Sequence, residues 1–271
     1  LRQQASLLLR SLTMKETVAR HVAPFIRDGK GDQAALRAFL VAGGSQNLSW
    51  LFDLLLDPRT ALNETLVGII QGFGREATEE ALRRMPGRDP QGIVRLLTLI
   101  RGVGEKVDAS SLKELLPNED WKVRREVIRT LIRFDDPAAG ELLRTTLQSK
   151  ERDRVLEAVG LSCRYRVEEM LADLQALIRI VLMREEDAIL NEWIVGEMMK
   201  TGHPAVVPLL EKIASARLTI SPKHLARLKR TLYRNLQRLP EEKIGKLLKM
   251  GSKSGDREIR TVCAAAAKSK E

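Results

Sequence analysis

The chain reads DWKVRREV at residues 120–127 and DREIRTVC at residues 256–263, and a short apolar helix is expected before each stretch. Comparable pairs of apolar helices return about every 31 to 35 residues along the sequence. One such pair cannot bury its apolar face alone, so each pair is expected to pack against its neighbours. The period therefore predicts an all-α solenoid of about seven to eight helical hairpins.

The composition agrees with this fold, because 44% of the residues are hydrophobic and only 4% are aromatic, with Leu, Ile, Val and Ala dominant. Such a composition is typical of helix packing and not of a β-sandwich. The second helix of each pair is expected to begin near a residue that accepts a hydrogen bond from the first-turn amides, as Asp89, Asp120, Ser221 and Asp256 can. The shared apolar rhythm places these second helices at about 32–43, 59–73, 89–102, 120–134, 152–164, 186–200, 221–238 and 256–268.

The helix pairs predict one domain that runs over residues 1–271. The chain opens at Leu1 without methionine, and it is expected to be a fragment of a longer protein. The repeats are expected as a partial leading repeat at 1–13, followed by full repeats at 14–45, 46–74, 75–104, 105–135, 136–165, 166–202, 203–239 and 240–271.

The segment TGHPAVVPLL at residues 201–210 and the spacing of Asp120 with Arg124 resemble the HEAT-repeat family, especially its short bacterial type. The resemblance covers about residues 14–268 and implies a right-handed α-α superhelix whose second helices line a concave surface. In that family a turn aspartate and an arginine early in the second helix form a ladder between units. This chain matches the ladder only at Asp120 with Arg124 and at Asp256 with Arg260. Apolar packing is therefore expected to contribute more of the contact between repeats.

A rival helical repeat is the 34-residue tetratricopeptide pattern, which needs an order of Trp, Gly, Tyr, Ala and Pro that this sequence lacks. The HEAT-like interpretation is therefore preferred over the tetratricopeptide one.

The residue types that carry chemistry are scattered along the chain. Cys163 and Cys263 are far apart and fall on predicted apolar helix faces, where reduced buried thiols are expected. The histidines His21, His203 and His224 lie in different repeats without a metal-binding spacing, and phosphate loops and the GxSxG motif are absent. The sequence therefore predicts no enzymatic activity, no cofactor, no metal and no small-molecule substrate.

The longest apolar stretch, Leu171–Met183, is interrupted by Asp173 and Arg179 and is shorter than the ~20 residues that a spanning helix needs. The start of the chain does not resemble a signal peptide. A soluble cytoplasmic protein without a membrane partner is expected.

Positive charge is concentrated at the C-terminal end. The net charge is +10, and residues 201–271 hold 16 Lys and Arg against 6 Asp and Glu. No acidic residue occurs between Lys212 and Pro240, so no nearby carboxylate is expected to neutralise the arginines of that segment. At 100° per residue, two second helices place cations opposite their apolar side; this basic strip is made of Lys122, Arg125, Arg129, Arg133, Lys223, Arg227, Arg230, Arg234 and Arg238.

The basic strip has three interpretations. Arginine binds carboxylates and phosphates bidentately, so the strip predicts recognition of acidic groups on a protein or peptide partner. A solvated helix face kept soluble by arginine is another interpretation. A phosphate backbone fits the same strip, so sequence-nonspecific nucleic-acid binding is the alternative function.

Apolar residues Val195 and Met199 occupy the outward positions of the predicted helix at 186–200, which suggests a groove for a helix or an extended segment of another protein. The alternative is that a neighbouring helix covers them. Small residues at the same positions of earlier repeats, Gly68, Gly72 and Gly102, extend this hypothetical groove.

An enzymatic relative is a minor alternative, since HEAT-like DNA glycosylases use tryptophans and an aspartate on a basic concave face. Trp50, Trp121 and Trp193 are available, with Asp120 or Asp187 beside two of them. Trp193 is nevertheless expected in the core, because it aligns with the apolar position of Val127. The sequence analysis thus favours a non-catalytic protein-binding scaffold.

Overall fold

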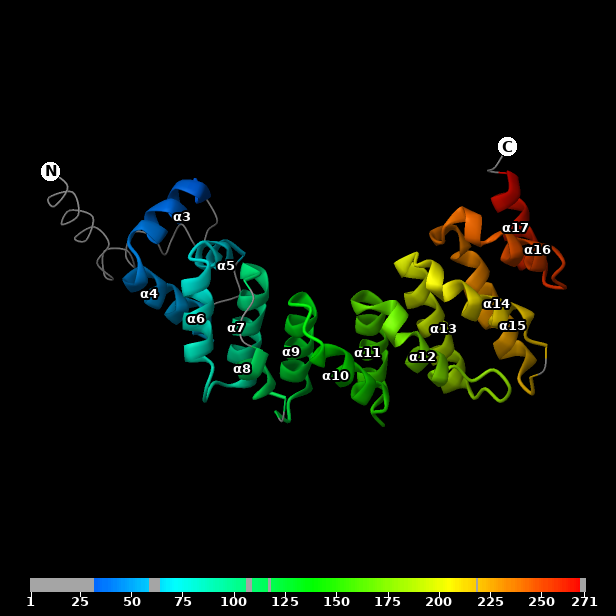
Figure 1. The fold of residues 1–271 in the computed structure, drawn as a ribbon, viewed down its shortest axis with the longest axis horizontal. Coiled ribbons are helices and arrows are strands. Elements are labelled where there is room, and N and C mark those ends of the chain that lie inside the picture. The colour runs from blue at the N-terminus through cyan, green and yellow to red at the C-terminus, as the bar shows by residue number, and fades with distance from the viewer. Residues whose placement is uncertain (1–31, 59–63, 106–108, 117, 218, 269–271) are drawn as a thin grey trace, which may run out of the picture. The chain divides into compact units, whose positions relative to one another are not determined.

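The computed structural model describes residues 32–58, 64–105, 109–116, 118–217 and 219–268. Within these ranges the chain forms fifteen α-helices and three short 3-10 helices, and no strand occurs among the described residues (Figure 1). The prediction of an all-α helical repeat is confirmed. The leading partial repeat at 1–13 lies outside the described residues.

Contacts divide the chain into two compact units, unit 1 (Leu1–Ala139) and unit 2 (Gly140–Glu271). The boundary falls inside helix α10 (Ala138–Leu147). The sequence predicts a single array, whereas the contacts group its helices into these two units.

Unit 1 is built from helices that pack on the pair before and the pair after. Its α-helices before α10 are α3 (Gln33–Ala42), α4 (Ser45–Leu56), α5 (Glu64–Gln71), α6 (Arg75–Arg84), α7 (Pro90–Val103), α8 (Ala109–Lys113) and α9 (Trp121–Arg133). The second helices of the pairs stack in the order α3, α5, α7 and α9, and the first helix α4 packs on α6. This nearest-neighbour packing is the arrangement that the repeat period predicts.

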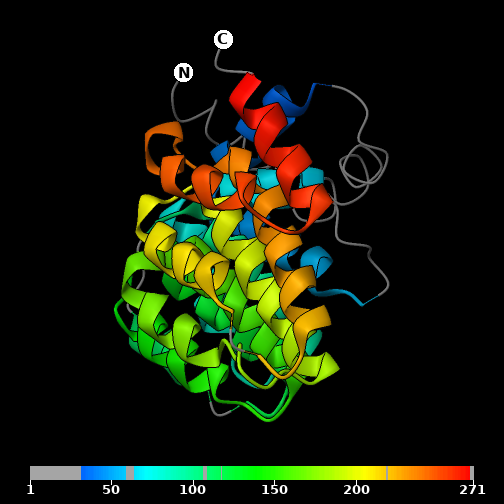
Figure 2. The ribbon, with the colours of Figure 1, turned by 90° about the vertical axis from the view of Figure 1, so that its right-hand side faces the viewer.

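Unit 2 repeats the scheme, with second helices stacked in the order α11, α13, α15 and α17. The C-terminal helices α16 and α17 pack against each other, as Figure 2 shows in orange and red. Beyond α10 the unit contains α11 (Arg152–Tyr165), α12 (Val167–Leu177), α13 (Glu185–Thr201), η1 (Pro204–Val206), α14 (Val207–Ser215), α15 (Pro222–Arg234), η2 (Leu236–Arg238), η3 (Glu241–Lys243), α16 (Gly245–Ser252) and α17 (Arg257–Lys268).

The leucine side of α15 faces the core as predicted, because Leu225, Leu228 and Leu232 are buried. The helix is shorter than the predicted range of 221–238. It ends at Arg234, and the side-chain amide of Asn235 donates to a carbonyl of the preceding turn. The chain then continues as the 3-10 helix η2.

Helix starts follow the predicted capping at several second helices. Asp89 accepts from the amide of Gly92 at 2.8 Å, and Asp120 accepts from the amide of Lys122 at 2.7 Å. Ser221 was expected to act in the same way, but its hydroxyl instead donates to the carbonyl of Met183 at 2.8 Å. That bond joins the start of α15 to the loop that precedes α13.

An added methyl group is expected to have opposite effects at two glycines of α16. A Cβ at Gly251 would lie 2.3 Å from Cys263 Sγ and 2.5 Å from the Tyr233 ring, whereas a Cβ at Gly245 meets nothing within 4 Å. The Tyr233 ring cannot move freely, because its hydroxyl donates to the Leu247 carbonyl.

We therefore expect Gly251→Ala to lower the free energy of unfolding by about 1–3 kcal/mol through overpacking. Gly245→Ala should leave it unchanged or raise it by up to about 1 kcal/mol, since alanine favours the helix. Urea unfolding followed by circular dichroism compares the two variants. Equal stability of both variants would show that the helices α16 and α17 are not packed as described.

Candidate functional site

The arginines of α15 are paired with carboxylates from the two neighbouring second helices. Arg227 Nη1 lies 2.7 Å from Glu185 Oε1, and Arg227 Nε also pairs with Glu192; both acids belong to α13. On the other side, Arg230 Nε lies 2.8 Å from Asp256 Oδ2 beside the start of α17. The expectation that nothing nearby neutralises these arginines is wrong, because the acids come from other repeats.

Arg234 continues this row, since its Nε lies 2.5 Å from Glu258 Oε1 of α17. The hydrogen bond from Arg227 lowers the pKa of Glu185 below its usual range. Burial acts to raise the pKa of Asp256, but the hydrogen bond from Arg230 helps to hold it below its usual value. The carboxylates of Glu185 and Asp256 therefore stay ionised at neutral pH and keep Arg227 and Arg230 engaged.

The α9 half of the basic strip belongs to unit 1 and is organised around Glu126. This buried carboxylate accepts from Arg101 Nη1 of α7 at 2.5 Å and from Arg129 Nη1 at 2.8 Å, and Arg125 Nε lies 3.3 Å away. Lys122 and Arg133 are exposed.

These pairs join consecutive second helices, and we call them the arginine ladder: Arg101 with Glu126, Arg227 with Glu185 and Glu192, Arg230 with Asp256, and Arg234 with Glu258. The ladder differs from the one that the HEAT resemblance implies. The guanidinium of Arg124 lies 5.8 Å from the Trp121 ring centre, and Arg260 donates to the Ser254 carbonyl. Lys223 and Arg238 form no ion pair within the described part of the chain.

Val195 and Met199 do not line an open groove, because both side chains are 0% exposed. The prediction of an apolar lane at these two residues is therefore wrong. The cause is the register of α13, whose apolar residues occur on every side, so that periodicity does not select a buried face.

The exposed side of α13 instead carries Trp193 and Ile189, which are 43% and 44% exposed. Trp193 was expected in the core, and this prediction is wrong as well. Its Nε1 donates to the Leu156 carbonyl of α11 at 3.0 Å, and the ammonium of Lys200 lies 5.5 Å from its ring centre. The indole is thus held in one orientation across two second helices.

At two outward glycines of unit 1, a long side chain from the preceding second helix occupies the space where a Cβ would lie. A Cβ at Gly72 would lie 2.4 Å from Arg37 Nε, and one at Gly102 would lie 2.0 Å from Gln71 Nε2. These two glycines therefore do not extend a groove, although nothing lies within 4 Å of a Cβ at Gly68.

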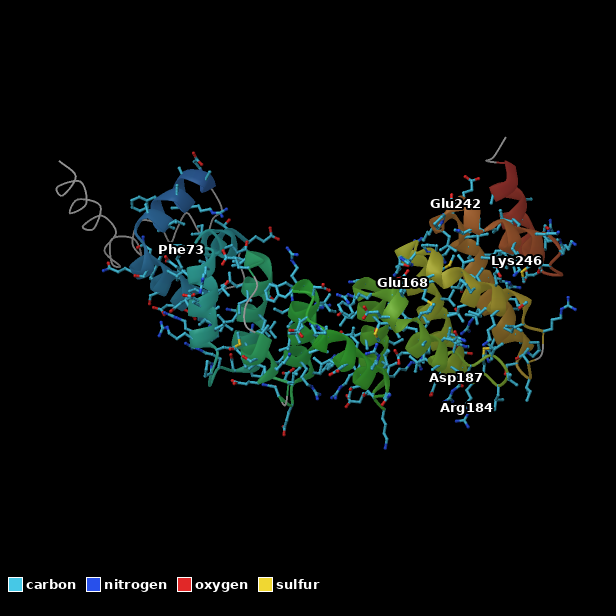
Figure 3. All side chains as sticks on the ribbon, in the orientation of Figure 1. Phe73, Glu168, Arg184, Asp187, Glu242 and Lys246 are labelled. Carbon is cyan, nitrogen blue, oxygen red and sulfur yellow. The ribbon has the colours of Figure 1, made fainter. Side chains whose placement is uncertain are left out.

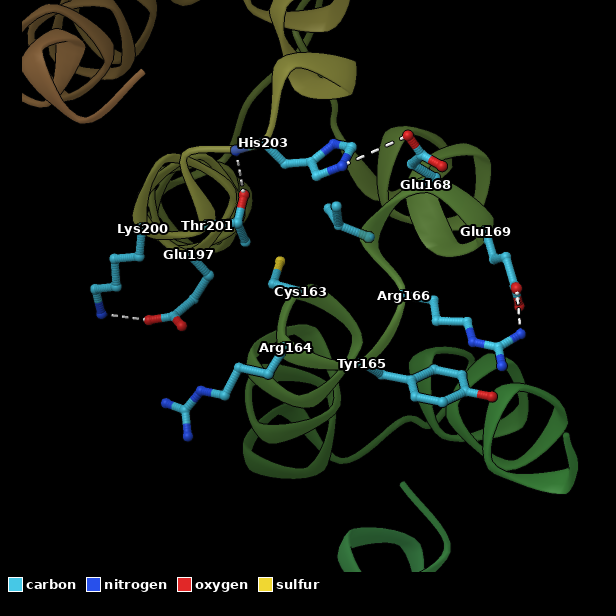
Figure 4. A pocket seen from close by; sticks show the side chains of 11 residues that line it. Cys163, Arg164, Tyr165, Arg166, Glu168, Glu169, Glu197, Lys200, Thr201 and His203 are labelled. Atoms are coloured by element: carbon cyan, nitrogen blue, oxygen red, sulfur yellow. Dashed lines mark hydrogen bonds and ion pairs between the residues drawn. The ribbon is translucent and has the colours of Figure 1, made fainter. Parts of the chain in front are cut away.

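A cleft of about 580 Å³ opens in unit 2 where α11 ends, α12 begins and α13 ends (Figure 4). Two ion pairs occupy its walls, Lys200 with Glu197 at 2.5 Å and Arg166 with Glu169 at 2.7 Å, and His203 Nε2 lies 3.5 Å from Glu168 Oε1. The acids and bases that line the cleft are largely paired with one another.

Cys163 also lines the cleft. Burial, and to a lesser degree the charge of Glu197, raises the pKa of its thiol to about 12. A thiol with this pKa stays protonated at neutral pH, whereas nucleophilic attack needs the thiolate. Within the described residues, no group of three or more His, Cys, Asp and Glu side chains is arranged to hold a metal ion.

The residues considered for glycosylase chemistry lie in two separate units. Trp50 is buried in unit 1, and Asp120 there accepts from the Lys122 amide. In unit 2, Asp187 accepts from the amide of Arg184 at 3.0 Å and caps the start of α13. Each aspartate thus serves its own helix start.

The helix packing defines an all-α helical-repeat protein. No protein-family model and no curated protein matches the chain. Two crystal structures of engineered proteins from the Northeast Structural Genomics Consortium are similar to it. The first has a TM-score of 0.36 at 15% identity and covers 96% of this chain and 76% of its own. The second has a TM-score of 0.30 at 16% identity and covers 84% of this chain and 95% of its own.

Glu126 makes the stability of unit 1 depend on pH. Burial alone would raise the pKa of this carboxyl, but the hydrogen bond from Arg101 and the charges of Arg129 and Arg125 outweigh it and lower the pKa. A lowered folded-state pKa stabilises the fold above the unfolded-state value of about 4.3, and this stabilisation is lost as the pH falls through the folded-state pKa.

We expect Glu126→Gln to lower the free energy of unfolding by about 2 kcal/mol at pH 7, because three guanidinium groups lose their shared anion. The difference from the wild type should shrink as the pH falls from 5 towards 2. Unfolding curves at several pH values measure it, and the exposed Glu169→Gln serves as the control, with a change of less than about 1 kcal/mol. A difference that stays constant over this range would contradict the assignment.

Proposed function

We propose that this chain is a non-catalytic, HEAT-like scaffold that binds another protein or a peptide on the exposed face of the second helices of unit 2. The observation that carries the proposal is Trp193, a large aromatic side chain that is 43% exposed yet fixed by a hydrogen bond to α11. Tryptophan is enriched among the residues that dominate binding energy at protein interfaces. A ring already held in place loses little conformational entropy on binding.

The neighbours of Trp193 indicate the chemistry of the partner. Ile189, one turn earlier on α13, adds exposed apolar surface, and Lys200 adds a half-exposed ammonium over the ring. An apolar residue flanked by carboxylates complements this group. We therefore infer a partner segment with an apolar anchor and acidic neighbours.

The arginine ladder adds to this surface without dominating it. Arg230 and Arg234 remain substantially exposed while they pair with Asp256 and Glu258. A guanidinium has five N–H donors, so an arginine with one carboxylate partner still has donors for a second. The partner's acidic groups are expected to bind these arginines while Asp256 and Glu258 remain bound to them.

Nucleic-acid binding is the second candidate, and the 16 basic against 6 acidic residues of 201–271 favour it. Phosphates would have to compete with the carboxylates of the ladder, whereas an aromatic anchor such as Trp193 suits a protein. Phosphate binding predicts affinity that falls steeply with salt.

The partner can be found by replacing Ile189 with a photo-reactive amino acid and isolating the cross-linked protein from cells. The exposed Gln237 of η2, replaced in the same way, is the control site. Titration of the purified partner then tests the anchor. Trp193→Ala is expected to weaken binding about 30-fold or more, because truncating an interface tryptophan costs about 2 kcal/mol or more.

The matched control is Ile220→Ser, which alters another exposed apolar residue of the same unit. Its affinity should equal that of the wild type. Unchanged affinity of Trp193→Ala would refute the proposed surface. Binding of duplex or single-stranded nucleic acid at 50 mM salt that collapses at 200 mM salt, and that ignores Trp193→Ala, would support the second candidate instead.

A further inference from the structure

Two loops of unit 2 are hydrogen-bonded side by side, at the end of the helix pairs where α13 and α15 begin. The amide of Ile220 donates to the Val181 carbonyl at 2.8 Å, and the hydroxyl of Ser221 donates to the Met183 carbonyl at 2.8 Å. We call residues 178–184 and 219–221 the paired loops. One main-chain hydrogen bond and one side-chain hydrogen bond thus join the two loops.

The paired loops are also anchored to the helices behind them. The side chain of Asn191 in α13 is buried; its Nδ2 donates to the Arg179 carbonyl at 2.6 Å and its Oδ1 accepts from the Arg179 amide at 3.2 Å. The hydroxyl of Thr219 donates to the Ile180 carbonyl at 3.0 Å. The loops are thus a built part of the fold.

Three aliphatic side chains nevertheless extend from the paired loops into solvent. Ile220 is 74% exposed, Val181 is 62% exposed and Leu182 is 58% exposed, and they are the three most exposed large hydrophobic residues of the described chain. A contiguous exposed apolar patch marks an interaction site more often than a single exposed side chain does.

Four cations lie within three residues of this patch in the sequence. Arg184 and Lys223 are exposed and flank the loops where α13 and α15 begin, and Figure 3 shows Arg184 at this edge of the unit. Arg217 precedes Thr219, and Arg179 is 71% exposed with Asp187 at 3.6 Å. Arg184, Arg217 and Lys223 form no ion pair within the described residues.

The acids of this edge are Glu185, Glu186 and Asp187 at the start of α13. Glu185 is paired with Arg227 and lies 3.5 Å from His224, and Asp187 accepts from the Arg184 amide. Glu186 is exposed and forms no ion pair within the described residues. Because Arg227 pairs with Glu185, the four cations Arg179, Arg184, Arg217 and Lys223 face two further acids, Glu186 and Asp187, and the edge carries a small excess of positive charge.

We propose that the paired loops dock unit 2 onto the surface of an anionic lipid bilayer. Val181, Leu182 and Ile220 enter the boundary between headgroups and acyl chains, and the surrounding cations bind the lipid phosphates and carboxylates. This contact is peripheral, and none of the described helices is both long and apolar enough to cross a bilayer. The inference goes beyond the proposed protein-binding surface and does not depend on it.

The chemistry of the patch favours lipid over two other occupants. A second copy of the chain would bring the same cations face to face, which opposes association. A protein partner is expected to meet aromatic or arginine anchors, whereas Leu and Val are under-represented at such anchors. Protruding aliphatic side chains need no complementary pocket in a bilayer. Two signals, apolar insertion and basic charge, are also what stable peripheral binding requires.

Co-sedimentation with vesicles tests the proposal. The chain should bind vesicles of phosphatidylcholine with 30% phosphatidylserine and should bind vesicles of phosphatidylcholine alone at least 10-fold more weakly. The variant Val181→Ser/Leu182→Ser/Ile220→Ser should lose at least 10-fold in partition coefficient, since both parts of the contact are needed. The matched control Ile189→Ser/Trp193→Ala, on the exposed side of α13, should bind like the wild type.

A fluorescent reporter gives a second, independent readout. The native Cys163 and Cys263 are buried, so Leu182→Cys can be labelled selectively with an environment-sensitive dye. The dye emission should shift to the blue with anionic vesicles and not with neutral ones. Failure of the wild type to bind anionic vesicles, serine-variant binding equal to the wild type, or an unshifted dye would each overturn the proposal. A dimer that the serine variant dissolves, without vesicle binding, would assign the patch to a second copy.

Discussion

The burial of one apolar face of each helix by the helices of the adjacent pairs is the constraint on which the rest of the structure depends. In unit 2, the buried leucines of α15 are covered because α13 and α17 pack on either side of that helix. Burying one leucine side chain contributes about 1.5–3 kcal/mol, whereas a solvent-exposed ion pair contributes about 0–1 kcal/mol. The apolar contacts therefore hold the helices of unit 2 together, and the exposed rungs of the arginine ladder in that unit contribute mainly to their alignment.

This constraint also explains which surfaces remain for binding. Side chains that point into the apolar contacts between helices, such as Val195 and Met199, are buried and are not available to a partner. Two of the surfaces that remain in unit 2 are the outward side of the second helices, with Trp193 fixed across two of them, and the loop end of the pairs, with the paired loops. The two surfaces differ in chemistry, since one offers an aromatic anchor and the other offers aliphatic side chains among cations. They are therefore suited to different partners.

The helices were predictable from the sequence, because the repeat period and several of the capping residues agree with one another along the chain. The inward face was predictable for α15, where leucines and arginines separate cleanly onto opposite sides. It was not predictable for α13, where apolar residues surround the helix and Trp193 aligned with a core position. The carboxylates of the ladder were also missed, because residues 24 to 42 positions apart meet only after the helices stack. Val181 and Leu182 were read only as part of the interrupted apolar stretch Leu171–Met183, and Ile220 was not singled out.

The arginine ladder has a further consequence for how the array can change its length. Each rung connects a second helix only to the next one, so the polar bonds of a given hairpin end at its immediate neighbours. A hairpin inserted or removed within a unit would disturb the apolar contacts with its two neighbours and the rungs beside them. More distant helices would keep their partners. Growth by duplication is therefore limited mainly by the fit at the new junction. A glutamate or an arginine at one end of a copied segment must find its opposite charge there.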